Sequence, residues 1–123
     1  MKVVFSENAP KALGPYSQAM VTSNLLFISG QGGIDPATGK LVEGIEAQTK
    51  QAIANIKAIL TEAGIGFENV VKTTCFLHEM SDFAAFNAIY GEAFISKPAR
   101  SCVAVKELPA NFLCEIEVIA EIK

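Results

Sequence analysis

The last strand predicted in this sequence, residues 113–122, constrains the fold most, because apolar and acidic side chains alternate along it. Apolar residues occupy every second position from Cys114 to Ile122, and glutamates occupy positions 115, 117 and 121. Successive side chains of a strand point to opposite faces, so one face of this strand is apolar and the other is acidic. The sheet that contains it must bury the apolar face in the core.

Helical periodicity is found in two segments. Apolar residues recur at helical spacing over residues 45–63, and Gly64 supplies the left-handed residue that often follows a helix. Ser81 and Asp82 can cap a second helix, which presents aromatic side chains on one face over residues 83–94. Both helices therefore have one apolar side to bury.

The remaining periodic segments are β-branched or aromatic and predict about six strands. The first three form an antiparallel sheet around a turn at Ser23 and Asn24. We expect one α+β domain over residues 1–123, in which both helices cover one face of a mixed sheet. The predicted strands are residues 3–5, 17–22, 25–29, 70–77, 101–106 and 113–122.

The last two strands are joined by turn residues 108–111, so we expect an antiparallel hairpin. Matching the apolar faces of the two strands places Arg100 and Cys102 on one face with Glu115 and Glu117. Arg100 and Glu115 are then about four residues apart along the hairpin, or ~13 Å. Because one chain could not offer both to a four-carbon ligand, we expect Arg100 of one subunit to meet Glu115 of the next.

Arg100 is the most informative charge, because it enters a largely apolar strand. A guanidinium can bind a planar carboxylate through two parallel hydrogen bonds, which lysine cannot do. The alternative is a structural salt bridge between Arg100 and a facing glutamate. The residues alone weigh these two interpretations equally.

Composition limits the partners of the chain. Half of the 123 residues are hydrophobic, so we expect apolar surface to meet other copies of the chain. The net charge of −3, with no basic cluster, argues against nucleic acid and anionic membranes. No apolar run resembles a signal peptide or a membrane span, and the three cysteines lack disulfide or metal spacing, so we expect a cytoplasmic protein.

Other candidate residues have simpler interpretations. Cys102 as a nucleophile would need a histidine, and His78 is expected on the surface without a role, so Cys102 is better explained as a small pocket-lining residue. The glycine-rich residues 30–33 lack the lysine of a phosphate loop and suit close backbone packing beside a ligand. Glu117 and Glu121 are expected to be solvated or to lie between subunits.

Five short motifs occur in order along nearly the whole chain. They are G-P-Y at 14–16, I-S-G-Q at 28–31, V-K-T-T at 71–74, P-A-R-S-C at 98–102 and E-I-E-V-I-A at 115–120. Together they resemble the Rid family of reactive-intermediate deaminases, and in particular its YjgF-like RidA branch. The resemblance implies a chorismate-mutase-like fold and a homotrimer with sites between subunits. It also implies hydrolysis of 2-iminopropanoate, formed from 2-aminoacrylate, and of 2-iminobutanoate to 2-oxo acids and ammonia, without metal or organic cofactor.

The resemblance also implies roles for individual residues. Arg100 matches the carboxylate-binding arginine, Glu115 the acid that positions water, and Cys102 a residue whose backbone holds the ligand. The remaining pocket residues match Tyr16, Ser29, Gly30 and Asn87, with the Gly30 backbone near the imine nitrogen. The resemblance leaves the substrate preference open, because the chain is several residues shorter than many relatives over residues 93–98, beside the expected cleft.

Two other functions are compatible with these residues. A non-catalytic sensor of small 2-oxo or amino acids would use Arg100 in the same way. A ribonuclease or translation inhibitor is the second alternative, and the acidic charge and single histidine count against it.

Overall fold

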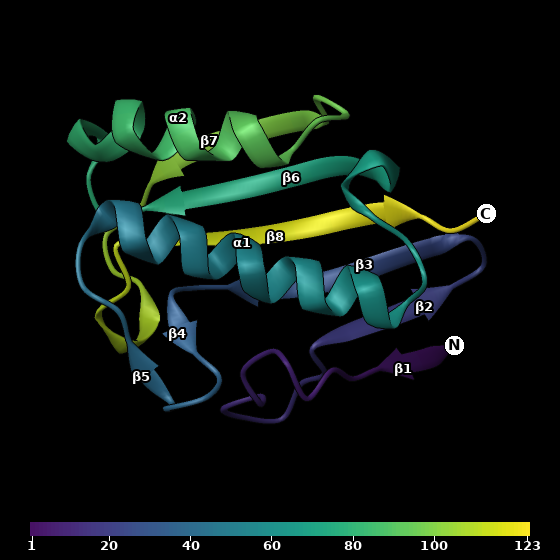
Figure 1. Cartoon of the computed structure of the whole chain (residues 1–123). Coiled ribbons are helices and arrows are strands. Elements are labelled where there is room, and N and C mark those ends of the chain that lie inside the picture. Colours follow the sequence, from purple (N-terminus) through teal and green to yellow (C-terminus); the bar gives the residue numbers. More distant parts are fainter.

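The computed structural model describes residues 1–123 as a six-stranded mixed sheet with two helices on one face (Figure 1). A separate antiparallel two-stranded ribbon pairs Ile34–Asp35 with Lys40–Leu41. The elements are β1 (Lys2–Val4), β2 (Ala19–Thr22), β3 (Leu25–Gln31), β4 (Ile34–Asp35), β5 (Lys40–Leu41), α1 (Ile45–Glu62), β6 (Val70–Leu77), α2 (Phe83–Ala93), β7 (Ala99–Ala104) and β8 (Cys114–Glu121), with short 3₁₀ turns at Phe67–Asn69, Met80–Asp82 and Pro109–Asn111. The expected α+β class is confirmed.

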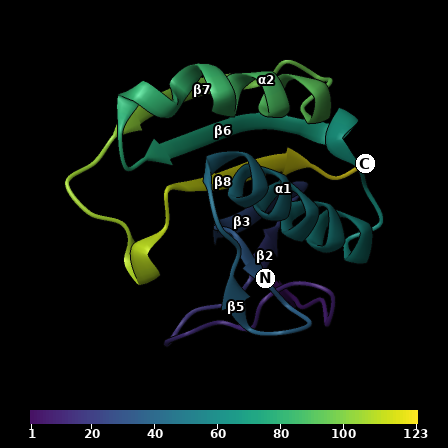
Figure 2. The same ribbon diagram turned by 60° about the vertical axis from the view of Figure 1, so that its left-hand side comes forward.

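The core lies between the two helices and the central strands. Figure 2 shows α1 and α2 on the same side of the sheet. Ile56 and Ile59 of α1 and Ile116 and Val118 of β8 are fully buried in one cluster. The apolar face predicted for the last strand is therefore the face that packs against the helices.

The helix ends follow the predictions in part. After α1, Gly64 is left-handed with φ of 79°, and Ile65 N donates to Leu60 O at 3.0 Å, which is the pattern of a Schellman motif. Asp82 occupies the position before α2, but its side chain forms no capping hydrogen bond, and the Ser81 hydroxyl donates to Glu79 instead. Side-chain capping of α2 is therefore not observed.

The strand order is β1-β2-β3-β8-β6-β7, so the predicted hairpin between the last two strands is wrong. β6 lies between β7 and β8, antiparallel to β8 and parallel to β7. The segment β6-α2-β7 is a crossover unit in which α2 returns the chain for a parallel pairing. β7 therefore pairs with β6 at the edge of the sheet and does not pair with β8.

The strand order also corrects the predicted faces. Arg100 pairs with Thr73 of β6, whose side chain is buried beneath the helices. Glu115 pairs instead with Phe76, three residues further along β6 and therefore on the other face. Arg100 and Cys102 thus lie on the helix side of the sheet, and Glu115 and Glu117 lie on the uncovered side.

The uncovered face of the sheet carries apolar side chains that the chain itself does not bury. Phe27, Val71 and Val103 are 40%, 46% and 47% exposed. Glu117 is also exposed on this face. No helix combines the length and apolar character needed to cross a lipid bilayer.

Candidate functional site

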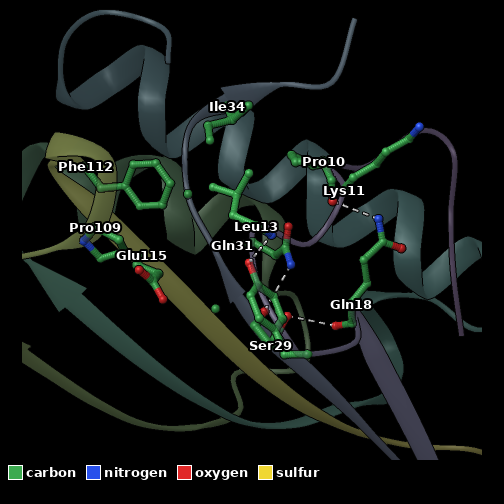
Figure 3. Close-up of a pocket in the computed structure, with 13 residues that line it drawn as sticks. Pro10, Lys11, Leu13, Gln18, Ser29, Gln31, Ile34, Pro109, Phe112 and Glu115 are labelled. Atoms are coloured by element: carbon green, nitrogen blue, oxygen red, sulfur yellow. Dashed lines mark hydrogen bonds between the residues drawn. The ribbon is translucent and has the colours of Figure 1, made fainter. Parts of the chain in front are cut away.

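A cavity of about 390 Å³ lies where β3 leaves the sheet beside the start of β8. We call it the Glu115 cavity. Figure 3 shows Glu115, Pro109 and Phe112 on one side of it and Gln18, Ser29 and Gln31 on the other. Its lining residues are Pro10, Lys11, Leu13, Tyr16, Gln18, Ser29, Gly30, Gln31, Gly32, Ile34, Pro109, Phe112 and Glu115.

A β-bulge shapes the floor of this cavity. The β3–β8 register shifts by one residue between Ile28 and Gln31, at the Ser29-Gly30 step. A bulge of this kind turns side chains out of the regular ladder and is common beside functional sites. A Cβ atom on Gly30 would overlap the Glu115 carboxylate, so only glycine lets the acid lie against the bulge.

The Glu115 carboxyl group is partly buried and lacks a full set of hydrogen bonds. Its Oε1 atom is buried and has no hydrogen-bond partner. Burial raises the pKa of the Glu115 carboxyl, and repulsion from Glu117 raises it further. A carboxyl group with a raised pKa exchanges a proton nearer neutral pH than an exposed glutamate does.

A buried amide fixes the other side of the cavity. Both the backbone N and the Oγ of Ser29 donate to the Gln18 carbonyl, at 2.9 and 3.0 Å. The Gln18 side chain accepts from Ser6 N at 2.7 Å and donates to the Pro10 carbonyl at 2.9 Å. Gln18 therefore joins β2 to the loop that forms one wall of the cavity.

Two aromatic side chains complete the walls. Tyr16 is 51% exposed, and its hydroxyl accepts from Leu13 N at 3.1 Å, which fixes the ring beside the turn after Gly14. The Phe112 ring packs where a Cβ on Gly32 would lie. The glycines at 30, 32 and 33 thus allow the close packing expected of the motif, and the ligand expected beside them stays a prediction.

A second group of functional candidates lies on the other face of the sheet. We call Phe83, Asn87, Tyr90 and Arg100 the Arg100 cluster. Arg100 Nη1 donates to Asn87 Oδ1 at 2.6 Å. The Arg100 Cζ lies 4.7 Å from the centroid of the Tyr90 ring and 5.5 Å from that of Phe83. Asn87 therefore contacts the guanidinium directly.

Arg100 has no carboxylate partner within the chain. The one ion pair present joins Lys123 Nζ to Glu121 Oε1 at 3.8 Å, at the exposed C-terminus. The structural salt bridge considered for Arg100 is therefore absent from the single chain. The cation remains available to a carboxylate from outside.

Cys102 lies next to the Arg100 cluster, paired with Cys75 across the parallel strands. Burial raises the pKa of Cys102, while Arg100 lowers it to a smaller extent. Burial raises the pKa of Cys75 to about 12. Both side chains are thus held as thiols, and neither has the lowered pKa of a reactive cysteine.

The seven predicted site residues fall into two groups. Tyr16, Ser29, Gly30 and Glu115 line the Glu115 cavity, and Asn87, Arg100 and Cys102 lie together on the opposite face of the sheet. His78 is exposed directly after β6, as expected, and no set of three or more metal-binding side chains converges anywhere in the chain.

Sequence reasoning missed Gln18 and Phe112. Phe112 lies just before the acidic strand, which could have identified it as a pocket wall. Gln18 carries no motif, because its role depends on contacts with Ser6 and Pro10 that only the folded loop creates.

Comparison with known proteins gives consistent matches over nearly the whole chain. The family model described as endoribonuclease L-PSP matches residues 6–122. A RutC family protein of Pyrococcus horikoshii is 54% identical over 121 residues, covering 97% of this chain and 96% of that protein. The 2-iminobutanoate/2-iminopropanoate deaminase of Salmonella typhimurium is 44% identical over 124 residues, covering 97% and 96%.

The fold has close counterparts among solved structures. Escherichia coli TdcF with bound serine superposes with a TM-score of 0.96 at 35% identity, covering 100% of both chains. With the family match over residues 6–122, this confirms the chorismate-mutase-like fold that the motifs implied.

Proposed function

The chain belongs to the Rid family, and on that premise we propose that it hydrolyses reactive 2-imino acids to 2-oxo acids and ammonia. The proposed substrates are 2-iminopropanoate and 2-iminobutanoate, which the deaminase of Salmonella typhimurium is named for. The reaction needs a held carboxylate, an oriented water and a group that exchanges a proton. The two groups of residues described above supply these three requirements.

In the proposed mechanism, Arg100 binds the substrate carboxylate, and Glu115 accepts a proton from a water whose oxygen attacks the carbon of the protonated imine. The resulting carbinolamine carries a hydroxyl group and the former imine nitrogen as an amine, with the Gly30 backbone beside the nitrogen. Glu115 then gives its proton to this nitrogen. The C–N bond breaks, ammonia leaves, and the hydroxyl group passes its proton to Glu115 as the C=O bond forms. A carboxyl group with a raised pKa takes and returns the proton at a pH closer to neutral than an ordinary glutamate would.

The observation that carries the proposal is the buried Oε1 of Glu115, which has no hydrogen-bond partner within a cavity of about 390 Å³. A buried carboxylate oxygen without a hydrogen bond lowers the stability of the fold, so its presence here favours a functional role for Glu115. We expect the carboxylate to turn this oxygen toward a water in the cavity, which would satisfy the oxygen and would lie where the mechanism needs it.

We further propose that each site forms between two subunits of a homotrimer, with Arg100, Asn87 and Cys102 from one and Tyr16, Ser29, Gly30 and Glu115 from the next. Two features support this arrangement. The two groups lie on opposite faces of the sheet within one chain, so no small ligand can reach both. The uncovered sheet face also exposes apolar side chains such as Phe27 and Val103, which a neighbouring subunit would bury.

The activity is tested by generating 2-aminoacrylate with a serine or threonine dehydratase and following pyruvate release. We expect the protein to accelerate release, and Arg100→Ala to remove most of the acceleration while the assembly persists. General acid–base assistance is worth about 10²–10⁴-fold, so Glu115→Gln should cost a factor in that range. Equal rates with and without the protein would contradict the deaminase proposal.

The shared site is tested by mixing two inactive variants, Arg100→Ala and Glu115→Gln, at equal ratio under conditions that exchange subunits. In a trimer with sites between subunits, random mixing restores both groups at about a quarter of the sites. We therefore expect recovery of about a quarter of the wild-type activity. If each site were built from one chain, the mixture would stay inactive.

A sensor of small amino or 2-oxo acids is a second candidate, because the TdcF relative carries bound serine. Such a protein would bind through Arg100 without needing Glu115 as a base. Binding of 2-oxobutanoate with no acceleration of imine hydrolysis would favour this function.

A further inference from the structure

The Arg100 guanidinium is held mainly by aromatic ring faces. Its Cζ lies 4.7 Å from the centroid of Tyr90, and the Phe83 ring lies beside it at 5.5 Å. The only hydrogen bond it donates goes to an amide oxygen, Asn87 Oδ1. No carboxylate contacts it.

The aromatic faces are presented by one side of α2. Residues 83, 87 and 90 are spaced three and four apart, so they lie together on the helix surface and point toward β7. Tyr90 is only 8% exposed, and both its hydroxyl group and its ring are held by neighbouring side chains. Its hydroxyl lies 2.7 Å from Thr73 Oγ1, and its ring stacks on that of Phe94 with a centroid separation of 4.3 Å.

We propose that Tyr90, assisted by Phe83, is a positioning residue that holds the Arg100 guanidinium in place for an incoming carboxylate without neutralising its charge. This inference rests on the proposed function, in which Arg100 is the anion-binding group.

The physical reason is the difference between a ring face and a carboxylate as a partner for arginine. An aromatic ring attracts a cation through its quadrupole and leaves the in-plane N–H donors free. A carboxylate would occupy those donors in a bidentate pair and would have to be displaced by the ligand. Ring stacking with one amide hydrogen bond therefore orders the side chain and preserves its donors.

The test compares four proteins, namely wild type, Tyr90→Leu, Tyr90→Phe and Phe86→Leu. Phe86 is the matched control, because it is fully buried and stacks on Tyr90 at 5.8 Å but forms no cation–π contact with Arg100. The readouts are the Kd for 2-oxobutanoate by calorimetry, KM and kcat for imine hydrolysis, and the thermal midpoint.

Tyr90→Leu should raise Kd and KM by about 5- to 30-fold, the range expected for a desolvated cation–π contact, with kcat changed less than about threefold. Tyr90→Phe keeps the ring face and should bind within about twofold of wild type. Phe86→Leu should lower the thermal midpoint and leave Kd unchanged. The inference would be overturned if Tyr90→Leu and Phe86→Leu weakened 2-oxobutanoate binding equally, or if Tyr90→Leu did not weaken it at all.

The Kd readout separates this inference from the proposed function. If the wild-type protein binds 2-oxobutanoate through Arg100 but hydrolyses no imine, the deaminase proposal fails and the Tyr90 comparison still decides the positioning role. If it binds no small carboxylate, Arg100 is not an anion site and the inference fails.

Phe83 provides a second variant in case Tyr90→Leu does not fold. Phe83 is only partly buried at the start of α2, so Phe83→Leu leaves most of the core intact. Its ring is further from the guanidinium, and we expect a rise in Kd of about two- to fivefold, with Phe83→Tyr close to wild type. Unchanged binding in Phe83→Leu, when Tyr90→Leu cannot be measured, would overturn the inference.

Discussion

Gly30 and Glu115 lie so close across the β3–β8 bulge that a Cβ atom on Gly30 would occupy the position of the Glu115 carboxylate. The atoms in conflict are the far end of a flexible side chain, so Gly30→Ala can fold by moving that carboxylate. We expect Gly30→Ala to keep its thermal midpoint within a few degrees and to lose about 10²-fold in kcat, measured by the coupled dehydratase assay.

Two other glycines serve as controls for this prediction. A Cβ on Gly33 would lie 2.8 Å from the backbone Cα of Gln48, so Gly33→Ala should lower stability. Gly91 has open space around it within α2, so Gly91→Ala should stabilise the fold by about 0.5–1 kcal/mol with unchanged activity. A Gly30→Ala variant that behaves like Gly91→Ala would contradict the predicted role of the carboxylate position.

Glu115→Gln should make the protein more stable at pH 8 while it removes activity. Burial and Glu117 raise the pKa of Glu115 in the folded state, so the folded chain holds this proton to a higher pH than the unfolded chain. The stability that the protonated group contributes is present at low pH and is lost as pH rises through the raised pKa.

Denaturant unfolding of wild type and Glu115→Gln across pH checks this sign. The variant should gain on the order of 1 kcal/mol at pH 8, and the gap should close as the pH falls below the ordinary carboxyl pKa. The wild-type kcat should fall with acidification through a midpoint above that ordinary pKa. A Glu115→Gln variant that is less stable at pH 8 would show that the carboxylate is paired.

Cys102→Ala should retain activity. Burial raises the pKa of the Cys102 thiol, and the resemblance assigns the ligand contact at this position to the backbone. We expect kcat within about threefold of wild type, and resistance of the wild-type protein to iodoacetamide at pH 7.5. Loss of 10²-fold or more, restored by no other small residue, would identify a thiol reaction instead.

Asn87→Asp should strengthen the contact with Arg100 and weaken ligand binding. The change replaces the amide oxygen, 2.6 Å from Arg100 Nη1, with a carboxylate oxygen. The new ion pair should raise the thermal midpoint, whereas its negative charge should raise the Kd for 2-oxobutanoate by about tenfold or more. Calorimetry and thermal unfolding of the same sample give both values. Tighter binding in this variant would contradict the view that Arg100 serves an external carboxylate.

Val103→Glu should prevent assembly without unfolding the chain. Val103 is 47% exposed on the uncovered face of the sheet, where a charge costs the monomer little. A charge buried without a partner between subunits is expensive, so light scattering should find monomers in place of trimers. Activity should fall with assembly, and an active Val103→Glu monomer would contradict the proposal of sites shared between subunits.

Local patterns predicted the secondary structure well. Helical periodicity located α1 and α2, and alternation identified which face of β8 enters the core. These predictions succeed because each depends only on residues near in sequence. The left-handed conformation of Gly64 was also predicted correctly, because a glycine just after a helix commonly adopts it.

The order of the strands was the part that local patterns could not determine. Alternation specifies which residues of one strand share a face, but it does not specify the neighbouring strand. The pattern of strand, helix and strand over residues 70–104 favours a parallel crossover, and this signal competes with a hairpin across the turn at 108–111. Because the crossover pairs β7 with β6, Arg100 lies on the opposite face from the one predicted.

The placement of Arg100 and Glu115 on opposite faces of the sheet would make the stability of an oligomer depend on its ligand. A small carboxylate that touches Arg100 of one chain and Glu115 of another would add its binding energy to that of their contact, through thermodynamic linkage. Dissociation upon dilution would then shift to lower protein concentration as the metabolite accumulates. The quaternary structure itself would thus report the level of the metabolite.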